Sequence, residues 1–381
     1  MSTPLYLDYA AATPMDPEVL AAMRPYFTEQ FYNPSATYLA AVGVRKDLEA
    51  ARARIAQILG ARPSEIIFTA GGTEANNLAI KGVLAQYPEG DMVVSAIEHE
   101  SVLRTAHASK NEVREIPVTP AGMVGPDSVI KLVDDRTVLV SVMYANNEVG
   151  SVQPIHQIAL ALDEIKRERR KAGNDLPLYL HVDAAQAAAY LDLHVSRLGV
   201  DLMTLNAGKI YGPKQCGLLF MASHVRLSPQ TLGGGQERGK RSGTENVPGF
   251  IGFAKALQLV QDRRHEEVER LKKLQNLFFH LLEEQIPAAV VNGSRKMRLP
   301  NNVHITLPGY DNERLLIELD DAGILCAAGS ACSASNEEPS HVLRAMGISE
   351  KDAQASLRFS MGRQTDEAAV RQAVKTLASL L

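Results

Sequence analysis

The chain has little of what marks a disulfide-rich, membrane-spanning or nucleic-acid-binding protein. Only three of its 381 residues are cysteines, Cys216, Cys326 and Cys332, and their spacing suggests neither disulfides nor a zinc knuckle. No apolar run approaches the ~20 residues of a membrane span, and the first residues lack the basic and apolar regions of a signal peptide. A net charge of -4 argues against nucleic-acid binding driven by overall charge. We therefore expect a cytoplasmic protein without direct nucleic-acid or membrane partners.

What the chain does have is a regular alternation of short apolar runs and helical segments. Its hydrophobic content of 45% and charged content of 22% are typical of a soluble globular enzyme. The predicted strands of the first two thirds are residues 66–69, 92–95, 113–118, 138–143, 178–182, 202–205 and 217–221. This alternation predicts an α/β fold with a mostly parallel sheet that helices cover on both faces.

The length predicts two domains, because 381 residues exceed one ordinary core. We expect a large α/β domain of residues 14–249 and a smaller α+β domain of residues 1–13 and 250–381. The sequence from Gly249 to about Gln285 is continuously compatible with a helix, which predicts one long helix joining the two domains.

Two of the apolar runs end near residues of opposite charge. Asp183 follows the run from Leu178 to Val182, and Lys209 comes after the run from Leu202 to Leu205. Strand ends of a doubly wound sheet meet in one crevice. A lysine that forms a Schiff base and an aspartate that holds the ring nitrogen protonated are the minimum that pyridoxal phosphate needs. The alternative is that Asp183 caps the next helix and Lys209 is a solvated loop residue.

A glycine-rich turn, Gly71-Gly72-Thr73, follows the predicted strand 66–69 and opens a helix. The N–H groups and the dipole at such a helix start favour an anion, although many turns of this kind bind none. His99 and Asn147 follow two other predicted strands, so they are expected at the same edge of the sheet. Considered alone, His99 is better interpreted as a structural residue at a helix start.

The three cysteines differ in their surroundings. Cys326 lies in an apolar run and is predicted to be a buried, small hydrophobic residue, and Cys216 is predicted to be structural as well. Cys332 lies among small and polar residues with nothing large to pack against. Reactivity requires an accessible thiol, so Cys332 is a candidate nucleophile. An ordinary surface thiol is the alternative.

Three further stretches each leave two interpretations open. Arg358 lies in an apolar strand and needs a carboxylate, either from the protein or from an amino-acid substrate. Asn33, in a turn-rich loop, either caps the following segment or faces a ligand. The glycine-rich residues 233–246, which include Thr244, either contact a phosphate or form a mobile surface loop.

Together these motifs resemble those of the NifS/IscS-like (group I) cysteine desulfurases, in the class V, fold type I family of pyridoxal-phosphate-dependent aminotransferases. The resemblance runs nearly end to end, from Tyr6 to Arg363. It implies a large domain with a seven-stranded, mostly parallel sheet, a smaller α+β domain and a homodimer. The motifs that carry it are Gly72-Thr73-Glu74-Ala75-Asn76-Asn77, Asn146-Asn147-Glu148-Val149-Gly150, His181-Val182-Asp183-Ala184-Ala185-Gln186, Lys209-Ile210-Tyr211-Gly212-Pro213-Lys214, Arg241-Ser242-Gly243-Thr244 and Gly329-Ser330-Ala331-Cys332.

The resemblance also implies roles for the candidate residues. Lys209 would hold pyridoxal phosphate, Asp183 would pair with its ring nitrogen, and His99 would stack on the ring and assist proton transfer. The remaining cofactor contacts would come from Gly72, Thr73, Asn147, Gln186, Asn206 and, from the other subunit, Thr244. The carboxylate of the substrate L-cysteine would be held by Arg358, Asn33 and Asn147.

In such an enzyme the thiolate of Cys332 would attack the substrate sulfur, which leaves a persulfide on the protein and yields L-alanine. The sulfur would pass to acceptor or scaffold proteins that serve iron–sulfur clusters, thio-cofactors or thiolated tRNA. The resemblance implies no resident metal, although Cys332 could transiently ligate a nascent iron–sulfur cluster.

The sequence departs from the family pattern at two places. Asn206-Ala207-Gly208 stands where the family usually has Ser-Gly-His, so the Asn206 amide or backbone N–H groups must replace an imidazole. Without compensation this costs ~1.5–3 kcal/mol of cofactor binding. The histidine that often follows the Asn-Pro-Ser segment is also absent from residues 38–43. Neither change involves the predicted catalytic residues, so we predict activity.

Two other functions are compatible with these residues. A related pyridoxal-phosphate lyase or aminotransferase, such as a selenocysteine lyase, would not always need attack by Cys332. A non-catalytic scaffold descended from such an enzyme is suggested by the altered Asn206-Ala207-Gly208 stretch. A protein that stays colourless when pyridoxal phosphate is added would favour the scaffold.

Overall fold

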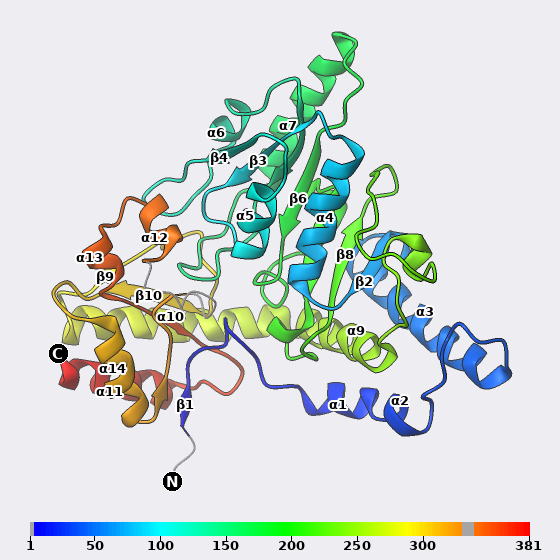
Figure 1. The fold of residues 1–381 in the computed structure, drawn as a ribbon. Coiled ribbons are helices and arrows are strands. Elements are labelled where there is room, and N and C mark those ends of the chain that lie inside the picture. Colours follow the sequence, from blue (N-terminus) through cyan, green and yellow to red (C-terminus); the bar gives the residue numbers. More distant parts are fainter. Residues whose placement is uncertain (1–3, 330–338) are drawn as a thin grey trace.

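A computed structural model describes residues 4–329 and 339–381 of the chain, and its centre is a seven-stranded sheet (Figure 1). The strand order is β2-β8-β7-β6-β5-β3-β4, and only β8 runs against its neighbours. The predicted α/β fold with a mostly parallel sheet is therefore confirmed. The strands are β2 (Ile66–Thr69), β3 (Asp91–Ser95), β4 (Val113–Ile116), β5 (Thr137–Ser141), β6 (Tyr179–Asp183), β7 (Leu202–Asn206) and β8 (Gly217–Met221).

Helices cover both faces of this sheet, because its strands are apolar on both sides. In β3, Met92 and Val94 pack with α4 and α5, whereas Val93 belongs to the larger core on the opposite face. Burying both faces explains why the strands read as continuous apolar runs. The helices of this part are α1 (Pro17–Met23), α2 (Pro25–Thr28), α3 (Leu39–Leu59), α4 (Gly72–Gln86), α5 (Glu100–His107), α6 (Pro126–Ile130), α7 (Ile155–Lys171), α8 (Val195–Leu198) and α9 (Val247–Asp262), with 3-10 turns η1 (Pro63–Glu65), η2 (Ala207–Lys209) and η3 (Glu237–Gly239).

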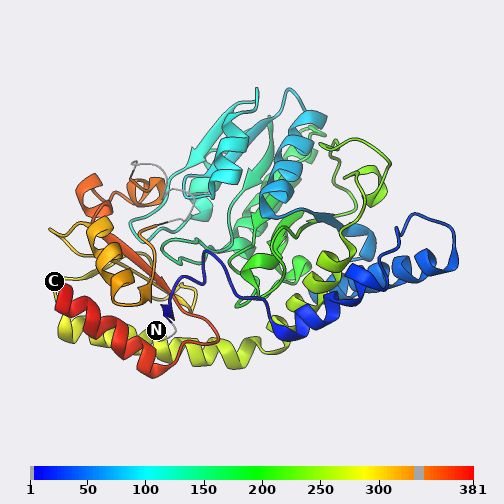
Figure 2. The same cartoon turned by 60° about the horizontal axis from the view of Figure 1, so that its bottom comes forward.

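The C-terminal third forms a smaller group of strands and helices beside the large sheet (Figures 1 and 2). One antiparallel sheet has the order β12-β10-β9, and a parallel pair joins β1 near the N-terminus to β11. Its elements are β1 (Leu5–Tyr6), β9 (Val290–Val291), β10 (Asn302–Thr306), β11 (Ile324–Leu325), β12 (Ser356–Ser360), α10 (Arg264–Gln285), α11 (Asn312–Asp321), α12 (His341–Ala345), α13 (Glu350–Ala353) and α14 (Glu367–Leu380). None of the helices in the described ranges combines the length and apolar character that a bilayer crossing needs.

The prediction of one long helix from Gly249 to Gln285 is wrong. Two helices, α9 and α10, meet at Arg263, whose φ of -94° and ψ of 1° are not those of an α-helix. The physical reason is that each half has its own packing partners. Helix α9 packs against α1 and α3, and α10 packs against α14 and β10. We propose that the boundary between the two parts lies at this break.

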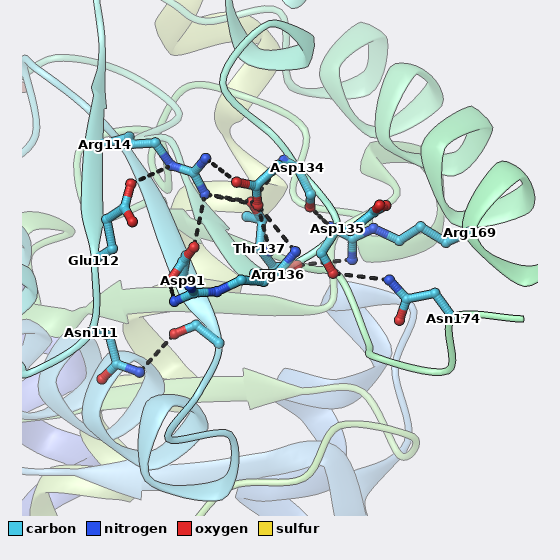
Figure 3. Close-up of polar contacts among 11 residues, drawn as sticks. Asp91, Asn111, Glu112, Arg114, Asp134, Asp135, Arg136, Thr137, Arg169 and Asn174 are labelled. Carbon is cyan, nitrogen blue, oxygen red and sulfur yellow. Dashed lines mark hydrogen bonds and ion pairs between the residues drawn. The ribbon is translucent and has the colours of Figure 1, made fainter. Parts of the chain in front are cut away.

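Charged residues tie together the amino ends of three neighbouring strands (Figure 3). Arg114 of β4 pairs with Asp134 at 2.5 Å, and Arg136 pairs with Asp91 of β3 at 2.8 Å. Hydrogen bonds from Arg114 hold the pKa of Asp134 below its ordinary value. These contacts secure the sheet at the end opposite to the one where parallel strands build their ligand sites.

The glycine-rich residues 233–246 are anchored by a buried ion pair. Glu237 accepts two hydrogen bonds from Arg52 of α3, at 2.7 and 2.8 Å, and both side chains are 3% exposed. Glu237 also accepts a hydrogen bond from the backbone N–H of Phe68 in β2. The interpretation of this stretch as a mobile loop therefore does not hold around Glu237.

We predict that Arg52→Met lowers the free energy of unfolding by about 3–5 kcal/mol, because it leaves the carboxylate of Glu237 buried without its cation. Urea unfolding would measure the loss. Arg54→Met, on the exposed side of the same helix, is the matched control and should change stability by no more than about 0.5 kcal/mol. Equal losses in the two variants would contradict the prediction.

Candidate active site

A cavity of about 210 Å³ lies at the carboxyl ends of the parallel strands. Because β2, β3, β5, β6 and β7 run in one direction, the residues that follow them meet at one edge. The residues singled out from the sequence that line this cavity are Gly72, Thr73, His99, Asn147, Asp183, Gln186, Asn206, Lys209 and Arg358.

Asp183 is the last residue of β6, and its carboxylate is largely buried. One oxygen accepts a hydrogen bond from the N–H of Ala185 at 2.9 Å, and the other accepts one from the side chain of Asn76 at 2.8 Å. The bond from Ala185 belongs to a turn, because the residues directly after β6 form turns and the next helix, α8, begins at Val195. The alternative that Asp183 caps the next helix is therefore wrong, and Asp183 lines the cavity.

Lys209 ends the 3-10 turn η2, directly after β7. Its Nζ donates to the backbone oxygens of Ala10 and Ala11, at 2.9 and 2.6 Å. Asn206 starts the turn, and its Oδ1 accepts a hydrogen bond from the N–H of Gly208. This cap turns the chain sharply at the strand end and directs the amine of Lys209 into the cavity that Asp183 lines.

His99 combines the two roles that the sequence left open. It is the N-cap of α5, and its Nδ1 accepts a hydrogen bond from the N–H of Ser101 at 3.0 Å. The structural role at a helix start is therefore confirmed. The same imidazole lines the cavity together with Asp183 and Lys209.

The first turn of α4 forms one wall of the cavity. Gly71 has a φ of 153°, a conformation that side chains disfavour, and its backbone packs so closely on β8 that a Cβ at Gly217 would lie 2.4 Å from the carbonyl carbon of Gly71. A second cavity, of about 550 Å³, adjoins this turn and is lined by Thr73, Lys240 and Arg241. Glu74 also lines this cavity and pairs with Arg241 at 2.7 Å, so the helix N–H groups and Lys240 are what make this end of the site suitable for an anion.

Arg358 has a carboxylate partner within the protein. Its Nη2 donates to Asp8 at 2.6 Å, and its Nη1 donates to the backbone oxygen of Asn147 at 3.0 Å. The side chain is 1% exposed, and its Nε has no hydrogen-bond partner among the described residues. The carboxylate that the buried guanidinium requires is thus Asp8, and a substrate carboxylate would have to share the guanidinium with it.

Two of the predicted residues that the structure describes, Asn33 and Thr244, do not line the cavity. Asn33 is exposed, and its Oδ1 accepts a hydrogen bond from the N–H of Ser35, which is the local capping role. Thr244 is also exposed. Cys332 lies outside the described residues. Burial raises the pKa of Cys326 to about 12, and burial also raises the pKa of Cys216, so both stay protonated thiols.

Sequence reasoning missed several residues of the site. Asn76 and Ser101 line the cavity, and Glu98 lies buried beside them. Asn76 belongs to a motif that had been noted, and its position four residues after Gly72 puts it on the same face of α4. Ser101 and Glu98 flank His99 in the sequence, but their roles depend on contacts with distant residues.

These groups fit pyridoxal phosphate. An amine from Lys209 and a carboxylate from Asp183 line one cavity that is small enough for a single aromatic molecule, and the start of α4 lies beside it for the phosphate. Asn76 lines the same cavity, and its Oδ1 is buried without a partner among the described residues. In those ranges no group of three or more metal-ligating side chains gathers.

Glu98 is fully buried, and its Oε1 accepts a hydrogen bond from the N–H of Met143. Burial raises the pKa of Glu98 well above its ordinary value, the bond from Met143 opposes this rise, and the charge of Asp183 adds to it. The other oxygen, Oε2, has no partner among the described residues. Glu98 is therefore a neutral acid next to the site.

We predict that the free energy of unfolding of the wild-type protein decreases as pH rises because of Glu98, and that Glu98→Gln abolishes this decrease. The unfolded chain releases this proton near pH ~4.3 while the folded chain keeps it, so folding is favoured at lower pH. Above that pH, the free energy of unfolding of the variant, relative to that of the wild type, should increase by up to ~1.4 kcal/mol per pH unit. The increase should stop at the pKa of Glu98 in the folded state. Urea unfolding from about pH 4 to about pH 8 would show this. Parallel curves for the two proteins would contradict it.

The chain matches a known protein family over nearly its whole length. The aminotransferase class-V family model matches residues 5–372. The chain is 40% identical to "Cysteine desulfurase IscS" of Dictyoglomus turgidum, with 96% of this chain and 91% of that protein covered. It is 40% identical to "Putative cysteine desulfurase IscS 1" of Bacillus subtilis, with 99% and 98% covered.

Solved structures give the same result. A "NIFS-LIKE PROTEIN" superposes with a TM-score of 0.90 at 30% identity over 99% of both chains. A structure titled "SspA in complex with cysteine" gives a TM-score of 0.81 at 32% identity, with 93% of this chain and 98% of that chain covered. The chain therefore belongs to the NifS/IscS-like group of the class-V aminotransferase family, which are pyridoxal-phosphate-dependent enzymes of fold type I.

Proposed function

We propose that the protein is a cysteine desulfurase, which converts L-cysteine to L-alanine and transfers the sulfur to its own Cys332. The observation that carries the proposal is the single cavity lined by Lys209, Asp183 and His99. The likeness to proteins named cysteine desulfurase supports the choice of L-cysteine over other amino acids.

Within this cavity each side chain has a distinct task. Bound pyridoxal phosphate supplies a ring that stabilises negative charge on the α-carbon of the substrate. The carboxylate of Asp183 keeps the ring nitrogen protonated, and the amine of Lys209 holds the cofactor and later moves the α-proton. Among the described residues, Arg358 donates two side-chain hydrogen bonds from its five N–H groups, which leaves donors for the substrate carboxylate.

The flanks of residues 330–338 support a role for Cys332. On one side, Ala327 pairs through its backbone with Arg358, whose side chain lines the cavity. On the other side, His341 forms a hydrogen bond to the backbone oxygen of Glu98, next to His99. Both attachments lie beside the cavity, so the described residues on either side of the segment that contains Cys332 are next to the proposed site.

The sulfur transfer balances without an external oxidant. The thiolate of Cys332 attacks the sulfur of the substrate, an S–S bond forms and the C–S bond breaks. The electron pair of the broken bond takes up a proton, and L-alanine leaves. The protein keeps the sulfur as a persulfide, which two acceptor thiols reduce to sulfide with formation of their disulfide. We propose sulfur-acceptor or iron–sulfur scaffold proteins as the physiological recipients.

We predict that Cys332→Ala abolishes release of alanine and sulfide from L-cysteine in the presence of dithiothreitol. Cofactor absorbance should remain, because the variant leaves the groups that line the cavity intact. Cys326→Ala is the matched control: it removes a thiol that burial keeps protonated, and it should retain turnover. Full activity of the Cys332→Ala protein would exclude Cys332 as the nucleophile. Lost L-cysteine turnover with retained selenocysteine turnover would favour a selenocysteine lyase.

We predict that Gly208→His tightens binding of pyridoxal phosphate by at least about tenfold, since a charge-assisted hydrogen bond contributes ~1.5–3 kcal/mol. The position has room, because a Cβ there would lie 3.4 Å from Oδ1 of Asn206 and 3.8 Å from the side chain of Lys214. Titration of the ligand-free protein with pyridoxal phosphate would measure the dissociation constant. Gly208→Ala, which adds a Cβ without an imidazole, is the control. Equal affinity of the two variants would mean that Asn206 already supplies the missing contact.

We also propose a homodimer in which Thr244 completes the phosphate end of the partner's site. Thr244 is exposed and does not line the cavity of its own chain, although Lys240 and Arg241 line the adjoining one. Light scattering should give about twice the 41.4 kDa mass of one chain. A mass near that of a single chain would contradict this proposal.

A further inference from the structure

A chain of hydrogen bonds connects the carboxylate of Asp183 to the imidazole of His99. Nδ2 of Asn76, in α4, donates to Oδ2 of Asp183 at 2.8 Å and to Oγ of Ser101 at 2.9 Å. Oγ of Ser101, in α5, lies 2.8 Å from Nδ1 of His99. Asn76 is 1% exposed. One buried carboxamide thus joins the carboxylate that would pair with the ring nitrogen of the cofactor to the imidazole that would stack on the ring.

The direction of each hydrogen bond follows from the chemistry of the groups. An ionised carboxylate only accepts, so the amino group of Asn76 must face Asp183. Its second hydrogen goes to Oγ of Ser101, which leaves the hydroxyl hydrogen of Ser101 to point at Nδ1 of His99. That nitrogen already accepts from the backbone N–H of Ser101 at 3.0 Å. A nitrogen that faces two donors carries no proton, so the proton of the neutral imidazole lies on Nε2.

The orientation of Asn76 has an energetic cost that the fold tolerates. Its Oδ1 is buried and has no partner among the described residues, and an unsatisfied buried acceptor destabilises the folded protein. Turning the amide over would bring that oxygen against the carboxylate of Asp183, which is worse. The Asn76 amide is therefore oriented so that Nδ2 donates to Asp183 and Ser101 while Oδ1 is left without a hydrogen bond among the described residues. Such an unsatisfied buried atom is expected at a functional position.

We infer that Asn76 is a positioning residue for the reaction proposed above: it orients Asp183 and, through Ser101, fixes His99 as the Nε2–H tautomer. Nε2 is then the nitrogen through which His99 exchanges protons in the cavity, and in its neutral form His99 acts there as a donor. The role of Asn76 in the reaction rests on the proposed function. The chain of hydrogen bonds is independent of that function, and it can be measured on the protein without substrate.

The tautomer is tested without any turnover. Nitrogen-15 NMR of the histidine rings in the ligand-free, full-length protein, with His99 assigned by comparison with His99→Gln, should show a protonated Nε2 and an unprotonated Nδ1. A proton on Nδ1 would overturn the inference. A protein with the expected tautomer that releases no alanine would instead refute the proposed function and leave the inference standing.

The role of Asn76 is tested against a matched buried asparagine outside the site. Asn292 also donates from Nδ2 to a threonine, Thr306, at 2.7 Å, and it contacts a histidine nitrogen, Nδ1 of His304, at 3.1 Å. Asn76→Ala should weaken binding of pyridoxal phosphate about tenfold, as the loss of ~1.4 kcal/mol implies, whereas Asn292→Ala should leave it within about twofold. If both variants lose only thermal stability, Asn76 is merely structural and the inference fails. Asn76→Ser is the second variant if the alanine protein does not fold.

A double-mutant cycle separates coupling from independent effects. Ser101→Ala removes the hydroxyl that links Asn76 to His99 but leaves the bond from Asn76 to Asp183 and the backbone N–H that donates to Nδ1 of His99, so it should lower kcat with little change in cofactor affinity. If the two residues act as one chain, the kcat of the Asn76→Ala/Ser101→Ala protein should be no lower than that of the slower of the two single variants. Losses that multiply would show that Asn76 does not act through Ser101.

Discussion

The site depends on a carboxylate held in place at the end of a buried strand. Asp183 is 8% exposed, and a carboxylate taken out of water stays ionised only when donors surround it. Here the donors are a backbone N–H and the amide of Asn76. Two titratable groups that interact with it carry no competing charge: burial keeps Glu98 protonated, and burial lowers the pKa of His181 to about 4.

Parallel topology brings the remaining groups to this carboxylate. Strands β2, β3, β5, β6 and β7 end at one edge, and each is followed by a turn that carries a side chain or N–H group of the cavity. The close packing of Gly217 on Gly71 sets the start of α4 against β8. At the other edge, the ion pairs of Arg114 and Arg136 fix the strand starts. The ion pairs that fix the strands thus lie at the amino ends of the sheet, and the reactive groups lie at its carboxyl ends.

The N-terminal segment and the C-terminal third of the chain also contribute contacts to the site. Residues that precede α1 supply the oxygens that hold the amine of Lys209, and the same segment supplies Asp8 to Arg358. Ser340 donates to Glu148, and His341 bonds to the backbone of Glu98. Each of these contacts joins the C-terminal third or the N-terminal segment to a residue at or beside the cavity. The chemistry we propose therefore requires both parts of the chain to be folded together.

Local patterns in the sequence were enough to predict the parallel sheet, the glycine turn before α4, and an aspartate and a lysine at neighbouring strand ends. These follow from periodicity and turn chemistry, which act over a few residues. The tertiary structure decided the rest: the break at Arg263, the pairing of Arg358 with Asp8, and the link from Asn76 to His99. Each depends on groups from distant parts of the chain that meet only after packing, and local patterns carry no information about which buried polar group will satisfy which other.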